Sequence, residues 1–124
     1  MQLYQGNCLD VMPQLPAGSI DAIITNLPYG KTNCPWDAVI PIGPMWAEVR
    51  RVLRPTGVVW MTIDWRGAMA LDTACARLGL RPPKVGVWDR GGLGLGHALR
   101  STYECFAVVP MANWSPLRHD VPDV

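Results

Sequence analysis

The sequence predicts an α/β protein whose mainly parallel sheet is built from strands that alternate with helices. Two short, mainly apolar runs, 20–24 and 58–63, have the length and composition of buried strands. Two longer segments, 44–54 and 66–78, carry apolar residues at helical spacing. This alternation favours a parallel sheet with crossover connections. The chain has 124 residues, of which 49% are hydrophobic, and this size and apolar content suit one domain.

Each element has a local signal for its beginning or end. We expect, in order, a strand over 2–5, a helix over 8–15, a central strand over 20–24, a helix over 44–54, a strand over 58–63, a helix over 66–78, and strands over 85–89 and 102–109. Pro13 shortens or kinks the first helix because proline cannot donate the helical hydrogen bond. Pro44 suits a first helical turn, and Gly79 ends the third helix. Residues 113–124 are expected to form an extended C-terminal arm.

Charge and cysteine content narrow the function classes. The 11 Lys and Arg residues nearly balance the 10 Asp and Glu residues, so contact with DNA would need a local basic patch. Candidates for such a patch are Lys31, Arg50, Arg51, Arg54, Arg90 and Arg100. The four cysteines lack Cys-x-x-Cys spacing and neither histidine lies at ligand spacing from one, so we expect no metal site. No apolar run approaches the roughly 20 residues that span a bilayer, and no secretion signal is present, so we expect a cytoplasmic protein.

A candidate binding site follows the central strand directly. The strand ends in the segment 26–29, Asn-Leu-Pro-Tyr, and proline and the following glycine break regular structure. In open α/β sheets, ligands bind outside the carboxyl ends of the strands. Asn26 offers a hydrogen-bond donor and an acceptor, and Tyr29 offers a flat face for stacking. The polar segment 31–37 would cover this site as a lid. An ordinary surface loop is the alternative, but Trp36 favours the lid because a large indole in a short loop usually packs or stacks.

The segment 26–29 resembles the Asp/Asn/Ser-Pro-Pro-Tyr/Phe motif of the DNA amino-methyltransferases, which methylate adenine N6 or cytosine N4. Leu27 departs from the usual proline, whereas Asn26 lies within the family pattern. Further stretches that resemble the family are 6–12, 15–16, 19–24, 36–37, 51–57, Arg100 and 103–104. The resemblance therefore covers nearly the whole chain. It implies a Rossmann-like methyltransferase sheet, S-adenosyl-L-methionine as the cofactor and DNA as the substrate.

The resemblance also implies roles for individual residues. The target base would be flipped out of the duplex. Tyr29 would stack on it, while the Asn26 side chain and the Leu27 carbonyl would accept hydrogen bonds from the exocyclic amine. The catalytic residues implied are Asn26, Leu27, Pro28 and Tyr29, and Asn26 would also lie beside the cofactor. The DNA contacts implied are Lys31, Thr32, Trp36, Arg90 and Arg100.

The resemblance is to the catalytic half of one permuted class, in which the catalytic motif comes before the cofactor motif. No stretch resembles the cofactor motif Asp-Pro-Phe-x-Gly-x-Gly. Residues 1–112 are therefore expected to form a partial, incomplete catalytic domain, and we expect weak or no methylation by this chain alone. In the family, two strands of the other half lie between the strand 2–5 and the central strand. Without them the central strand has an open edge, so we expect a rearranged first strand, a homodimer or a separate cofactor-binding half.

Three functions remain open from the sequence. The first is a DNA amino-methyltransferase or its catalytic half, and the second is a non-catalytic remnant or subunit that keeps the fold and a DNA surface. The third is an α/β domain in which the 26–29 turn is a structural cap. The glycine-rich stretch 91–96 favours a mobile loop beside the base pocket over a dinucleotide site, because a strand rather than a helix follows it. We expect Arg100 and Glu104 to fix that strand as a pair.

Overall fold

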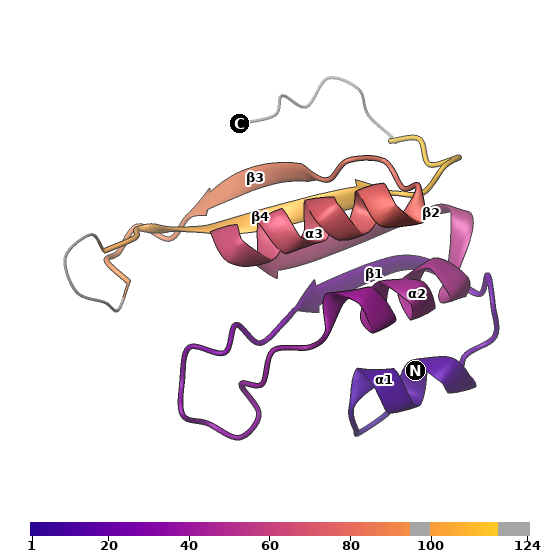
Figure 1. Ribbon diagram of the computed structural model, residues 1–124, viewed down its shortest axis with the longest axis horizontal. Helices are drawn as coiled ribbons and strands as arrows, with labels where there is room; N and C mark the ends of the chain where they lie inside the picture. Colours follow the sequence, from indigo (N-terminus) through magenta and orange to yellow (C-terminus); the bar gives the residue numbers. More distant parts are fainter. Residues whose placement is uncertain (95–99, 117–124) are drawn as a thin grey trace.

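The computed structural model describes residues 1–94 and 100–116, which form a four-stranded sheet with helices against it (Figure 1). The strands are β1 (Ile20–Asn26), β2 (Leu53–Ile63), β3 (Lys84–Asp89) and β4 (Tyr103–Pro110), in the order β1-β2-β4-β3. β1 and β2 run parallel, whereas β4 runs antiparallel to both of its neighbours. Three of the four strands therefore point the same way, and the predicted α/β class with a mainly parallel sheet is confirmed.

The reversed direction of β4 follows from the connection before it. β1 leads to β2, and β2 leads to β3, through helices, as crossover connections between strands of one direction require. β3 and β4 are neighbours, and the described part of the connection between them, 90–94 and 100–102, contains no helix. Neighbouring strands joined in this way pair antiparallel. Residues 95 and 96 of the glycine-rich stretch lie outside the described residues.

Side-chain caps and turn residues explain the limits of the helices. The helices are α1 (Cys8–Val11), a 3₁₀ turn η1 (Met12–Gln14), α2 (Ile42–Val52) and α3 (Trp65–Leu78). Asn7 caps α1 by accepting a hydrogen bond from the Leu9 amide at 3.0 Å, and Pro13 lies in the 3₁₀ turn that ends it. Gly79 ends α3 in the left-handed conformation, with φ of 65°, as predicted. None of the helices in the described residues has the length and apolar character to cross a membrane.

The core lies between the sheet and the helices α2 and α3, which cover one face of it (Figure 1). Alternate residues of β2 point into this core, since side chains alternate between the two faces of a strand. The fully buried side chains of the core include Trp46 of α2, Leu71 and Cys75 of α3, Val59 of β2 and Val109 of β4. Most of the apolar residues at helical spacing in the two long helices are buried or partly buried, but Met69 of α3 is 66% exposed.

The opposite face of the sheet is apolar but lacks a covering layer among the described residues. Strand register places Ile24, Trp60 and Val108 side by side on this face. Ile24 is 85% exposed and Trp60 is 44% exposed, although Trp60 stacks on Phe106 with a centroid distance of 5.5 Å. We call this surface the uncovered face. Continuous apolar strands of this kind are typical of sheets buried on both sides.

The predicted first strand is wrong. Residues 2–5 form no strand, and residues 1–6 are exposed and irregular. β1 is consequently an edge strand whose outer side has no partner in the described part of the chain. A segment of four residues gains little from extended structure unless it adds to a sheet. The helix predicted over 44–54 also ends earlier, at Val52, because Leu53 already pairs with Ile20 as the first residue of β2.

Candidate functional site

The site begins where the two parallel strands end. Asn26 is the last residue of β1 and lies opposite Thr62 of β2. The Thr62 hydroxyl donates a hydrogen bond to the Asn26 side-chain carbonyl. This contact fixes the orientation of the amide, and it leaves one lone pair of the carbonyl oxygen for another donor. Asn26 therefore presents an oriented acceptor at the carboxyl ends of β1 and β2, where α/β proteins bind ligands.

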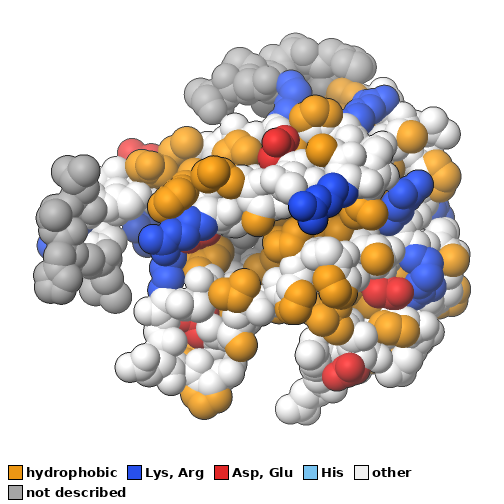
Figure 2. All heavy atoms as spheres, viewed as in Figure 1, with side chains coloured by type: hydrophobic (Ala, Val, Ile, Leu, Met, Phe, Trp, Pro, Cys, Tyr) orange, Lys and Arg blue, Asp and Glu red, His pale blue; other side chains and the backbone are white. Residues whose placement is uncertain are grey.

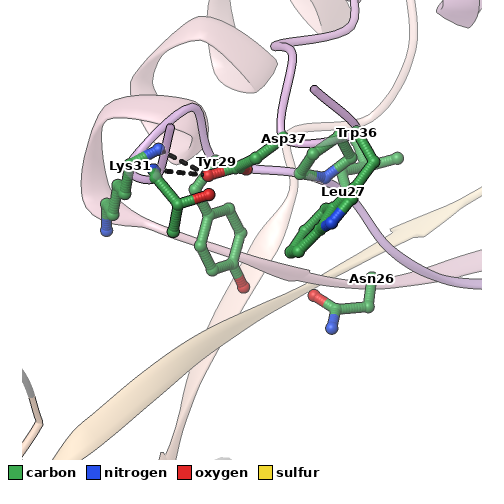
Figure 3. Close-up of a pocket in the computed structure, with 8 residues that line it drawn as sticks. Asn26, Leu27, Tyr29, Lys31, Trp36 and Asp37 are labelled. Carbon is green, nitrogen blue, oxygen red and sulfur yellow. Dashed lines mark hydrogen bonds between the residues drawn. The ribbon is translucent and has the colours of Figure 1, made fainter. Parts of the chain in front are cut away.

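A pocket of about 320 Å³ opens at this point (Figure 3). Its lining consists of Asn26, Leu27, Pro28, Tyr29, Lys31, Thr32, Trp36 and Asp37. The structure thus brings together all four residues predicted as catalytic and three of those predicted to contact DNA. Their roles stay predictions. Trp36 is 71% exposed, so its indole offers an accessible stacking surface at the edge of the pocket.

A carboxylate that sequence reasoning did not single out organises the loop around the pocket. Asp37 is only 8% exposed and accepts hydrogen bonds from three backbone amides. Its Oδ1 lies 2.9 Å from the Gly30 nitrogen, and its Oδ2 lies 2.8 Å and 2.7 Å from those of Lys31 and Thr32. Hydrogen bonding from the Thr32 side chain, joined by these amides, outweighs burial and lowers the pKa of Asp37 to about 2. The sequence signals at this position were an acid next to a tryptophan in a short loop and the family resemblance of 36–37.

Lys31 links this loop to the helix after β2. Its ammonium nitrogen lies 5.0 Å from the centroid of the Tyr29 ring and 3.1 Å from the Asp64 carboxylate. Asp64 caps α3 through the Gly67 amide at 2.9 Å. Burial raises the pKa of Asp64, but the Gly67 amide and the Lys31 and Arg66 charges together lower it. Asp64 is therefore an anion that holds Lys31 against Tyr29.

The Tyr29 hydroxyl is buried and has no hydrogen-bond partner within the described part of the chain. Buried hydroxyls are usually paired, and leaving one unpaired costs free energy. Figure 3 shows the Tyr29 ring beside Lys31, in the same pocket as Trp36 and Asn26. The ring thus lines the pocket, while its hydroxyl is enclosed by the protein.

The two arginines predicted to contact DNA lie in a different region, the connection between β3 and β4. Arg90 pairs with Glu104 at 3.1 Å and also donates to the Ser101 carbonyl. Arg100 donates to the Gly94 carbonyl at 2.7 Å. The expected pairing of Arg100 with Glu104 is therefore corrected to Arg90 with Glu104, because β3 and β4 bring residues 14 positions apart into contact. Neither arginine lines the pocket.

The basic side chains visible on the helix-covered face do not form one block. Figure 2 shows Lys and Arg side chains spread over the helix-covered face, with apolar side chains between them. Among the described residues, no three His, Cys, Asp or Glu side chains come together as a metal site. Burial, followed by the charge of Asp72, raises the pKa of the Cys75 thiol to about 11, so this thiol is protonated and unreactive at neutral pH.

The chain matches no protein-family model and no curated protein sequence. Its fold does resemble solved structures. A protein from Thermus thermophilus described as a candidate DNA modification methylase has 16% sequence identity and a TM-score of 0.65, over 94% of this chain and 54% of that chain. Its complex with S-adenosyl-L-methionine gives 17% identity and a TM-score of 0.60, over 94% and 56%. M1.HpyAVI in complex with the same cofactor gives 14% identity and a TM-score of 0.55, over 92% and 57%.

A fourth structural neighbour has a different described activity. The precorrin 8w decarboxylase from the Methanobacterium thermoautotrophicum genome matches 89% of this chain and 55% of its own, with 14% identity and a TM-score of 0.60. These similarities show a methyltransferase-like α/β fold, and a fold shared with a decarboxylase does not by itself define a substrate. The chain spans little more than half the length of each of these structures.

Proposed function

We propose that the chain is an S-adenosyl-L-methionine-dependent DNA amino-methyltransferase, acting on adenine N6 or cytosine N4, or the catalytic half of one. The observation that carries the proposal is the position of Asn26 and Tyr29. Both border one pocket at the carboxyl end of β1, within an Asn-Leu-Pro-Tyr segment that resembles the family motif. The candidate DNA modification methylase among the structural neighbours, and the neighbours bound to S-adenosyl-L-methionine, support this proposal.

The proposed chemistry uses positioning rather than a nucleophile or metal of the protein. The target base would be flipped into the pocket and stacked on Tyr29. The Asn26 side-chain carbonyl, already oriented by Thr62, and the Leu27 backbone carbonyl would accept hydrogen bonds from the exocyclic amine. These acceptors stabilise the positive charge that develops on the amine nitrogen, so their effect is greatest in the transition state. Lys31, Thr32 and Trp36 would contact the DNA beside the pocket. Arg90 and Arg100 would contact it farther away, at the connection between β3 and β4.

The described pocket does not fit the whole cofactor. Its one carboxylate, Asp37, is already bound by three backbone amides, so it is not available for ribose hydroxyls or an amino group. Asn26 is then the one residue of the pocket that we assign to the cofactor. A cofactor-binding half supplied as a partner would provide the remaining contacts. A homodimer is the second proposed assembly, and both would use the open side of β1.

The second candidate function is a non-catalytic subunit that keeps the fold and binds DNA. The occupied Asp37 carboxylate favours this candidate. A chain whose pocket has no free groups for the cofactor cannot methylate DNA by itself. Trp36 and Lys31 would still offer a stacking surface and a charge to nucleic acid.

Two measurements separate these candidates. Calorimetry with S-adenosyl-L-methionine on this chain alone should show weak or no binding. Transfer of labelled methyl groups to DNA should then appear when the part of a methylase neighbour outside the match is supplied as a second polypeptide, and should be lost with Asn26→Ala. DNA binding without methyl transfer in every combination would favour the non-catalytic subunit. Absence of both activities would contradict both candidates.

A further inference from the structure

Three consecutive backbone amides point at one buried carboxylate in the loop after β1. The amides belong to Gly30, Lys31 and Thr32, and the carboxylate is that of Asp37. Gly30 has φ of +64°, and a Cβ atom built there would lie 2.6 Å from a methyl group of Val39. The backbone therefore bends tightly at a position that only glycine suits, and the bend turns all three N–H groups inward.

The Asp37 carboxylate accepts the backbone hydrogen bonds that a helix or strand would otherwise accept in this loop. Consecutive N–H groups that converge on one point form a concave site for an anion. Without Asp37 these three donors would lose the partner that they have inside the protein, and these hydrogen bonds are partly shielded from water. Asp37 binds them with both of its oxygens, so the loop keeps one conformation without a helix or strand.

This loop conformation determines where the pocket side chains lie. Tyr29 directly precedes the three amides, and Lys31 supplies one of them. The same Lys31 places its ammonium group over the Tyr29 ring and on Asp64 of the α3 cap. A turn that relaxed at Gly30 would release the backbone on both sides of this contact. The Tyr29 ring would then no longer be held in the pocket before a ligand arrives.

We propose that Asp37 is a positioning residue for base binding: by binding the amides of Gly30, Lys31 and Thr32, it holds Tyr29 in the orientation that stacks on a flipped base. This inference rests on the proposed function for its ligand. It does not make Asp37 a catalytic residue, because its oxygens are engaged by the backbone and do not reach the base. Pre-organisation of this kind increases affinity because the ordering cost is met before binding.

The test uses removal of the carboxylate and its replacement from solution. Asp37→Gly leaves the three amides facing a space into which formate could bind. Hydrogen exchange at Gly30, Lys31 and Thr32 should become faster in this variant, and sodium formate should slow it again. Asp72→Asn serves as the matched control, since Asp72 is exposed on α3. It should change neither the rate of hydrogen exchange at residues 30–32 nor the response of that rate to formate. Unchanged exchange in Asp37→Gly would overturn the inference.

Binding of a labelled single-stranded adenine oligonucleotide supplies the second readout. Loss of a base–aromatic stack weakens binding roughly 5- to 150-fold, and we expect Asp37→Gly and Tyr29→Ala each to fall in this range. The double variant should be little weaker than Tyr29→Ala alone, because Asp37 acts through the ring. Formate should restore binding in Asp37→Gly but not in Tyr29→Ala.

The outcomes keep the two proposals apart. Losses that simply multiply in the double variant would make Asp37 a general stability residue and overturn the inference, while the function would stand. The same holds if Tyr29→Ala weakens binding and Asp37→Gly does not. If neither wild type nor variants bind the oligonucleotide, the positioning role is overturned. The methyl-transfer measurement then decides the proposed function separately.

Discussion

Both faces of the sheet carry apolar side chains, but they differ in what lies against them. On one face, Val59, Met61 and Val109 are buried beneath α2 and α3. On the other face, Ile24 and Trp60 are exposed within the described part of the chain. Parallel strands are normally covered on both sides, so we predict that a partner covers the apolar face that the described residues leave exposed. The site side chain Asn26 lies at the end of β1, whose outer edge has no partner strand among the described residues.

The comparison predicts unequal costs for shortening an apolar side chain on the two sides of the sheet. Leu71→Ala, under the covered face, should lower the free energy of unfolding by about 2–5 kcal/mol because it leaves a cavity in the core. Ile24→Ala, on the uncovered face, should change it by no more than about 0.5 kcal/mol. Urea denaturation of the two variants measures both values. Similar losses would show that the uncovered face is buried in solution by another molecule or segment.

Variants of the pocket separate a catalytic role from a structural cap. With the cofactor-binding half supplied, Tyr29→Ala should remove roughly 1–3 kcal/mol of base binding, whereas Tyr29→Phe keeps the stacking face and most of the activity. Asn26→Ala should lower turnover more than DNA affinity, since it removes an acceptor that matters most as charge develops on the amine. Melting temperature is measured beside the methylation rate. If Tyr29→Ala and Asn26→Ala lose equal stability while turnover per folded molecule is unchanged, the 26–29 turn is a structural cap and not a catalytic motif.

Self-association tests whether the uncovered face and the β1 edge accept a second copy. We expect the chain to associate at concentrations on the order of tens of micromolar, a typical range for modest affinity. Ile24→Lys adds a charge beside the open edge and should shift the equilibrium to monomer without unfolding the chain. Light scattering measures the mass, and Asp72→Asn on the helical side is the control. A wild-type chain that stays monomeric would contradict the homodimer. The separate cofactor-binding half would then be the remaining proposed partner for the edge of β1.

Acid should open the pocket loop without unfolding the sheet. The pKa of Asp37 in the folded chain is about 2, against an ordinary value of 3.8. The lowered folded-state value means that the Asp37 contribution is complete above about pH 4 and is lost as the pH falls toward about 2. Amide exchange or chemical shifts at residues 30–32, followed against pH, measure this transition. It should be absent in Asp37→Asn, and its presence there would assign it to another group.

Local signals in the sequence were enough to predict most of the elements. The apolar runs gave β1 and β2, Gly79 gave the end of α3, and the 26–29 segment gave the turn at the carboxyl end of β1. These predictions succeeded because strand ends, helix caps and turns depend on a few adjacent residues. The same locality explains why seven of the nine predicted pocket and DNA residues line one pocket, since they lie within 26–36.

Tertiary structure decided the features that depend on distant pairing. Residues 2–5 are apolar enough for a strand, but a strand needs a neighbour, and none of the described strands pairs with them. Glu104 meets Arg90 because β3 and β4 pair, and Thr62 meets Asn26 because β1 and β2 run in register. The burial of Asp37 depends on how the loop folds back on itself. By itself the sequence determined the elements and the chemical groups of the site, whereas the orientation of those groups and the uncovered face came from long-range hydrogen bonding and packing.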